Sequence, residues 1–171
     1  DVKEKIALFC DVDPHAVIPM PTASTIYEVP LILQESGVDR FIDEHLHLNS
    51  HEPQLDDWRD LVDRLKHPER KVRVAIVGKY VELHDAYMSV TESLTLAGLA
   101  YGAKPEIEWV NSETMTPEEM EHVFRTVQGI VVPGGFGPRG TEGKIVAARY
   151  CRETGTPYFG LCYGLHMAVI E

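Results

Sequence analysis

From residue 72 onward, short runs of β-branched and apolar residues alternate with stretches in which apolar residues recur at helical spacing. The runs predict four buried strands, at residues 72–77, 106–110, 129–133 and 157–161. The stretches beside them predict four helices, at residues 86–101, 117–127, 140–153 and 163–171. This alternation is typical of an α/β fold with an open, mostly parallel sheet and right-handed crossovers. Such sheets bind ligands at the carboxyl ends of their strands.

The first 48 residues follow a weaker pattern. Residues 5–10 form an apolar run that predicts a buried strand, and residues 16–18 predict a shorter one that prolines interrupt. Residues 26–36 predict a helix that ends at Gly37. Because this part is too small to be a domain alone, we expect it to be the tail of a larger one.

Residues 49–71 are polar and predict an interdomain linker, with a short helix near residues 55–65. His45, His47 and His51 could in principle gather around a cation. No cysteine or carboxylate cage accompanies them at tetrahedral spacing, so we expect a solvated linker and no metal site.

The composition narrows the class of partner. The 171 residues carry 27 acidic and 16 basic side chains, a formal net charge of −11. An acidic surface disfavours nonspecific binding to nucleic acid or to anionic lipid, although it leaves room for a small nucleotide. No apolar stretch approaches the roughly 20 residues of a membrane span, and there is no secretory signal. Three scattered cysteines suit a reduced, cytoplasmic setting, and a first residue that is Asp1 suggests a processed chain or a fragment.

The strongest motif surrounds Cys162. Gly160-Leu-Cys162-Tyr163-Gly164 lies between a predicted strand and a predicted helix, which is typical of a nucleophile elbow with cysteine as the nucleophile. The tight turn needs small residues two positions before and after the cysteine, and the N–H of Tyr163 can bind a developing oxyanion. The alternative is a structural cysteine beside two glycines.

The other two cysteines lack that context. Cys10 lies in an apolar run and Cys151 lies in a predicted helix, so we expect both to be structural.

A glycine-rich loop follows the predicted strand at residues 129–133. It contains Gly134, Gly135, Gly137 and Gly140, which permit close approach of the backbone to a ligand. The loop lacks the Gly-Lys-Ser/Thr of a phosphate-binding P-loop. We expect its strand to neighbour the Cys162 strand, so the loop is either the second half of an oxyanion hole or a plain tight turn.

These motifs together resemble a known family. Residues 133–137 followed by residues 160–164 resemble the flavodoxin-like class I (triad) glutamine amidotransferases. Within that class, residues 77–87 and 134–144 are similar to CTP synthases, and so are residues 6–10 and 24–30. The resemblance covers essentially the whole chain.

The resemblance implies a division into three parts. Residues 1–48 would be the C-terminal tail of a P-loop-type synthetase domain, residues 49–71 a linker, and residues 72–171 the N-terminal part of the amidotransferase domain. The complete enzyme would be a cytoplasmic ligase that makes CTP from UTP, ATP and glutamine. It would use Mg²⁺, respond to GTP and assemble as a homotetramer. No cofactor is expected within this segment.

The resemblance also implies roles for single residues. Cys162 would be the nucleophile, with Gly134 or Gly135 and Tyr163 forming the oxyanion hole. The residues expected to line the glutamine pocket are Gly135, Tyr163, Gly164, Leu165 and His166. The residues expected near the GTP effector region are Phe136, Arg139 and Glu142, with Lys79 and Tyr80 in a mobile lid.

Some positions depart from the family pattern. His166 stands where many relatives have Gln, Met88 where many have Lys, and Thr22 where many have Asp. The triad needs a His-x-Glu pair downstream of the cysteine, and none follows Cys162 in this sequence. The resemblance places the ATP, magnesium and UTP sites upstream of Asp1, so we expect the chain alone to be inactive. Two alternatives stay open: another class I amidotransferase or γ-glutamyl hydrolase, and a truncated chain that binds or regulates without turnover.

Overall fold

The computed structural model describes residues 1–171, and they form two compact units. The first unit is Asp1–Lys66 and the second is His67–Glu171. The division falls inside the polar stretch 49–71. Each unit is described by itself below.

The predicted strand at residues 5–10 is wrong, because these residues belong to helix α1, Val2–Cys10. The carboxylate of Asp1 caps this helix by accepting a hydrogen bond from the N–H of Lys3. The first unit contains no strand, so an extended segment here would have no partner for its backbone groups. Only Ala7 of the helix is buried, and the apolar run is largely exposed, Phe9 by 79%.

The remainder of the first unit is also helical. The weak strand expected at residues 16–18 is likewise wrong, since Ala16 ends a 3-10 helix at Pro14–Ala16 and the next two residues form no regular element. The helix expected before Gly37 is confirmed as a 3-10 turn at Ile26–Glu28 followed by α2, Val29–Ser36, and Gly37 ends it at a φ of 76°. Two more helices follow: α3, Val38–Leu46, which the pattern did not predict, and α4, Asp56–Lys66, which it did.

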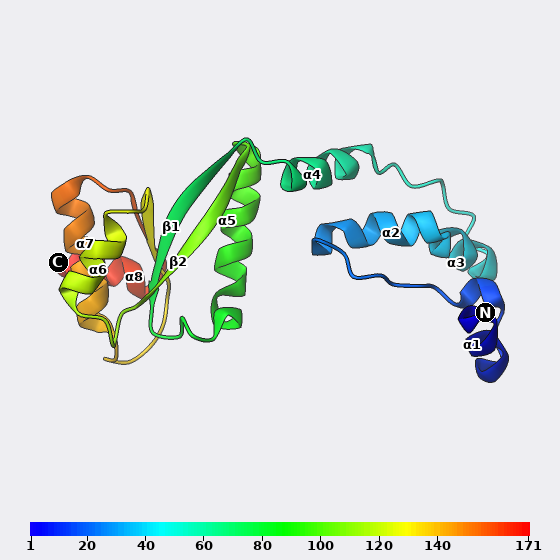
Figure 1. Cartoon of the computed structure of the whole chain (residues 1–171), viewed down its shortest axis with the longest axis horizontal. Helices are drawn as coiled ribbons and strands as arrows, with labels where there is room; N and C mark the ends of the chain where they lie inside the picture. The colour runs from blue at the N-terminus through cyan, green and yellow to red at the C-terminus, as the bar shows by residue number, and fades with distance from the viewer. The chain divides into compact units, whose positions relative to one another are not determined.

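The second unit is built on a four-stranded parallel sheet (Figure 1). Its strands are β1, Arg70–Gly78; β2, Ala103–Asn111; β3, Gly129–Val132; and β4, Tyr158–Gly160. Their order is β2-β1-β3-β4. The predicted strands and the α/β fold class are therefore confirmed, and β3 and β4 are neighbours as expected.

Four helices connect or follow these strands, as predicted. They are α5, Met88–Ala100, which a 3-10 turn at His84–Tyr87 precedes; α6, Pro117–Phe124; α7, Thr141–Thr154; and α8, Tyr163–Ile170. Helix α6 begins with a capping box in which Thr116 and Glu119 each bond the other's backbone N–H. It ends three residues before the predicted Val127. None of the chain's helices is both long enough and apolar enough to cross a bilayer.

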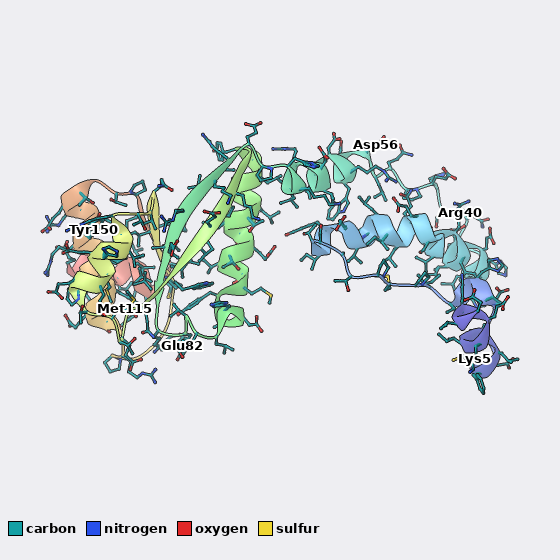
Figure 2. The ribbon with its side chains drawn as sticks, viewed as in Figure 1. Lys5, Arg40, Asp56, Glu82, Met115 and Tyr150 are labelled. Atoms are coloured by element: carbon teal, nitrogen blue, oxygen red, sulfur yellow. The ribbon has the colours of Figure 1, made fainter.

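Alternate residues of β1 send their side chains to opposite faces of the sheet. Ala75 and Val77 join the core beneath α6 and α7, whereas Ile76 joins the core beneath α5. Figure 1 shows α5 on one side of the sheet and α6 and α7 on the other. Tyr150 of α7, labelled in Figure 2, packs on Phe124 of α6 with ring centroids 5.2 Å apart. This three-layer packing fixes the strand ends from which the candidate site is built.

Candidate active site

Cys162 lies in the sharp turn between β4 and α8, and its backbone has φ 50° and ψ −106°. A side-chain-bearing residue pays about 1–3 kcal/mol for such a conformation, and strained residues of this kind gather at active sites. The residue is exposed, so the turn presents its thiol to solvent. This is the geometry that the elbow motif predicts.

The two glycines of the motif are required by close backbone contacts. A Cβ on Gly160 would lie 2.6 Å from the carbonyl carbon of Gly164, and a Cβ on Gly164 would lie 2.0 Å from the carbonyl oxygen of Val132. Neither clash can be relieved by moving a side chain, because both partners are backbone atoms. Strand β4, helix α8 and strand β3 therefore meet in van der Waals contact around Cys162.

The pairing of β3 with β4 brings the glycine-rich loop beside Cys162. Val132 pairs with Gly160, and its carbonyl accepts the N–H of Leu161 at 2.9 Å. The Cβ position of Gly134 lies 3.6 Å from the Cβ of Cys162. The two motifs that the sequence places at neighbouring strand ends are thus in contact.

Tyr163 begins α8 next to Cys162. Its hydroxyl lies 3.1 Å from the hydroxyl of Thr141 on α7, which holds its ring over the loop side of the site. The N–H groups of Leu165 and His166 bond the Cys162 carbonyl at 3.0 and 3.2 Å. The N–H of Tyr163 belongs to the first turn of the helix, where backbone donors have no partner within the helix and are free to bind an oxyanion.

The remaining residues expected to line a glutamine pocket differ in exposure. Gly164 is buried against β3, whereas Leu165 and His166 are exposed. The imidazole of His166 lies 6.3 Å from the ring of Tyr163, with the rings tilted, one helical turn beyond Cys162.

The residues expected near an effector region lie in the exposed part of the glycine-rich loop and in the first turn of α7. Phe136 is 89% exposed, and Glu142 is exposed in the first turn of α7. The guanidinium of Arg139 forms two hydrogen bonds of 2.9 Å to the carboxylate of Glu113, which raises the pKa of Arg139.

The segment after β1 reaches the same loop, and Figure 2 labels Glu82 within it. The ammonium of Lys79 donates a hydrogen bond to the carbonyl of Phe136 and lies 5.1 Å from the ring of Tyr80. The N–H of Tyr80 donates to the hydroxyl of Tyr87, 3.3 Å away. Of the two expected lid residues, Lys79 therefore contacts the glycine-rich loop directly, whereas Tyr80 contacts Lys79 and Tyr87.

Lys144 is a residue of the site that the sequence reasoning missed. It lies in α7, is only 2% exposed, and its ammonium donates a hydrogen bond of 3.1 Å to the carbonyl of Pro133. Burial lowers its pKa, as does the neighbouring charge of Lys79. A lysine in a predicted helix is normally expected at the surface. The one signal in the sequence is its position three residues after the start of α7, close to the glycine-rich loop that precedes the helix.

The three cysteines have different surroundings. Cys162 and Cys10 are exposed, whereas Cys151 is buried in the core beneath α7. Burial raises the pKa of Cys151 to about 11, which keeps its thiol protonated. Cys151 is buried, as expected for a structural cysteine. Cys10 is exposed, although its apolar run predicted that it would be buried.

This difference predicts an order of alkylation. With iodoacetamide at about pH 8, Cys151 should react at least about 100-fold more slowly than Cys10, because the thiolate is the reactive form. Cys162 should react readily because it is exposed. Peptide mass spectrometry over a time course measures all three, and denaturant should equalise them. Equal rates for Cys151 and Cys10 in the folded chain would contradict the buried position of Cys151.

No group of three or more His, Cys, Asp or Glu side chains in the chain is placed to hold a metal ion. The second unit instead offers an exposed thiol, a glycine-rich loop with backbone donors, and a buried ammonium. That set of groups suits nucleophilic attack on a carbonyl carbon.

Comparison with known proteins agrees with this geometry. The family model for class I glutamine amidotransferases matches residues 82–171, and the chain belongs to that family. A second model, the CTP synthase N-terminus, matches residues 1–48. The family recognised in the sequence motifs is thus confirmed.

Individual relatives are CTP synthases. The chain is 62% identical over its whole length to CTP synthase of Thermomicrobium roseum and 47% identical to that of Bacillus velezensis. It spans 31% and 32% of those proteins' lengths. A solved Trypanosoma brucei CTPS glutaminase domain with bound acivicin is 38% identical, with a TM-score of 0.51, over 58% of this chain and 39% of that one.

Proposed function

We propose that the chain supplies the nucleophile and the oxyanion hole for glutamine hydrolysis in a longer protein that makes CTP. The observation that carries this proposal is the strained turn at Cys162, whose Cβ lies 3.6 Å from the Cβ position of Gly134. A nucleophile and a loop of backbone donors are thereby held at one point.

In the proposed reaction, the thiolate of Cys162 attacks the side-chain amide carbon of glutamine. The new carbon–sulfur bond gives a tetrahedral intermediate, and breaking its carbon–nitrogen bond releases ammonia and leaves a γ-glutamyl thioester. Water then hydrolyses the thioester to glutamate and regenerates the thiol. The base that takes the thiol proton and returns one to the leaving nitrogen would be the His-x-Glu pair of the class I triad, and no such pair follows Cys162 in this sequence.

Backbone N–H groups would stabilise the intermediate. The N–H of Tyr163 and that of Gly134 or Gly135 would bind the negative oxygen. The positive end of α8 would favour the thiolate form of Cys162. Gly135, Gly164, Leu165 and His166 would surround the glutamine side chain.

The ammonia would aminate UTP in an ATP-dependent synthetase domain. The carboxylates of this chain form no group that could hold the Mg²⁺ of that reaction. GTP would act on the loop that holds Phe136, Arg139 and Glu142, with Lys79 and Tyr80 beside it. We propose a cytoplasmic homotetramer for the complete protein, in line with the family resemblance.

A glutamine-analogue electrophile tests the role of Cys162. A chloroketone analogue of glutamine, added to the full-length protein, is expected to label Cys162 before Cys10 or Cys151, and excess glutamine should slow only the Cys162 reaction. Equal labelling of Cys162 and Cys10, with no protection by glutamine, would favour a chain that binds or regulates without turnover. Glutamine protection without CTP formation would favour another class I amidotransferase or a γ-glutamyl hydrolase.

A further inference from the structure

Lys144 is a buried ammonium that the proposed reaction leaves without a role. It is 2% exposed, and Ser112 is the only other buried polar or charged residue. Taking an ammonium out of water is costly unless a partner compensates it. Lys144 forms no ion pair with a carboxylate, so its compensation comes from other groups.

Those groups belong to both halves of the candidate oxyanion hole. On the loop side, the ammonium donates to the Pro133 carbonyl at 3.1 Å and lies 3.7 Å from the Cβ position of Gly135. On the elbow side, it lies 5.3 Å from the ring centroid of Tyr163, within cation–π range. One side chain therefore bridges the two segments whose N–H groups must point at a single oxygen.

The hydrogen bond to Pro133 fixes the orientation of the next N–H. The chain has no cis peptide bond, so the Pro133 carbonyl and the Gly134 N–H point in opposite directions from one peptide plane. While Lys144 holds the carbonyl, the N–H of Gly134 must face away from Lys144. Gly134 is the residue whose Cβ position lies against Cys162.

The charge of Lys144 also bears on Cys162. Burial and the positive charge of Lys79 lower the pKa of Lys144, whereas the negative charge of a Cys162 thiolate raises it. The Lys144 ammonium and a Cys162 thiolate therefore attract each other. The titratable groups around Lys144 and Cys162 include Lys79, from the segment after β1, and Tyr163 and His166, from α8.

We propose that Lys144 is a positioning residue for attack by Cys162: its buried ammonium holds the Pro133–Gly134 peptide and the Tyr163 ring in register. The expected effect of Lys144 on glutamine turnover rests on the proposed glutaminase function, whereas its expected effect on alkylation of Cys162 does not. It predicts a defect in the rate of reaction rather than in the binding of glutamine.

The test replaces Lys144 by methionine in the full-length protein. Lys144→Met keeps the length of the side chain and removes the charge and the donor, and a buried apolar side chain is tolerated where a buried charge was costly. The kcat for glutamine hydrolysis is expected to fall about 10- to 100-fold with KM for glutamine within about threefold. The matched control is Lys104→Met, an exposed lysine of β2, which should leave both unchanged.

A second readout uses the pH dependence of alkylation. The pH midpoint for reaction of Cys162 with iodoacetamide should move up in Lys144→Met, because the positive charge that attracts the thiolate is lost. Continued protection of Cys151 in the same sample shows that the core is folded. A purely structural role of Lys144 would not move this midpoint.

The outcomes separate the two proposals. If the unmodified protein hydrolyses glutamine and Lys144→Met does so with unchanged kcat and an unchanged alkylation midpoint, the role of Lys144 is overturned. If the unmodified protein does not hydrolyse glutamine but the alkylation midpoint still shifts, the proposed function fails while the role of Lys144 toward Cys162 stands.

Discussion

Replacing Cys162 by alanine in the full-length protein is expected to abolish glutamine-dependent CTP formation, with kcat lower by at least about 1,000-fold. The substitution removes the only atom that can form the thioester and leaves the backbone turn in place. Formation of CTP from added ammonium should continue, because free ammonia does not need the thiol. The rates of glutamate and CTP release, measured separately, check both expectations.

Cys10→Ala is the matched control for this substitution. Cys10 is exposed like Cys162 but lies in α1 of the first unit, away from any elbow. It should retain the glutamine-dependent rate. Substantial glutamine hydrolysis by Cys162→Ala would remove Cys162 from the reaction, and loss of the ammonium-dependent rate as well would point to a folding defect.

Replacing Gly164 by alanine is expected to loosen the core and the active site together. Helix propensity alone would favour alanine in α8 by about 1 kcal/mol. The added Cβ would instead lie 2.0 Å from the carbonyl oxygen of Val132, so α8 must move away from β3. We expect a net loss of about 2 kcal/mol or more in the stability of this region.

Alkylation of Cys151 measures that loss, because the thiol reacts only when its core opens. A loss of about 2 kcal/mol corresponds to roughly 30-fold faster labelling under native conditions. Val169→Ala, at a site of α8 that is 77% exposed, should change the labelling rate little. An unchanged Cys151 rate in Gly164→Ala would show that α8 does not pack on β3 as closely as these contacts require.

The second unit could be predicted well because its elements agree at several levels. The β-branched run of β1 and the proline and capping residues of α6 each specify local structure without help from distant residues. The elbow was predictable for a similar reason: Gly160 and Gly164 are spaced as a tight turn requires, and in the structure a Cβ at either position would clash with backbone atoms. Local signals of this kind survive in a single sequence.

The first unit shows what such signals leave out. An apolar run such as residues 5–10 is compatible with a strand or a helix, and the absence of a pairing strand decides between them. Lys144 was missed because its role depends on where the Pro133 carbonyl points, which is a property of the assembled sheet. Unlike the glycines of the elbow, a lysine does not reveal in the sequence which backbone carbonyl its side chain reaches.

The backbone of Cys162 places stability and chemistry in opposition. Glycine adopts a φ of 50° at little cost, whereas cysteine there carries strain. Selection for a stable, well-expressed protein would therefore favour glycine at position 162, and only selection for turnover would keep cysteine. A library screened for expression alone is therefore expected to enrich glycine at position 162.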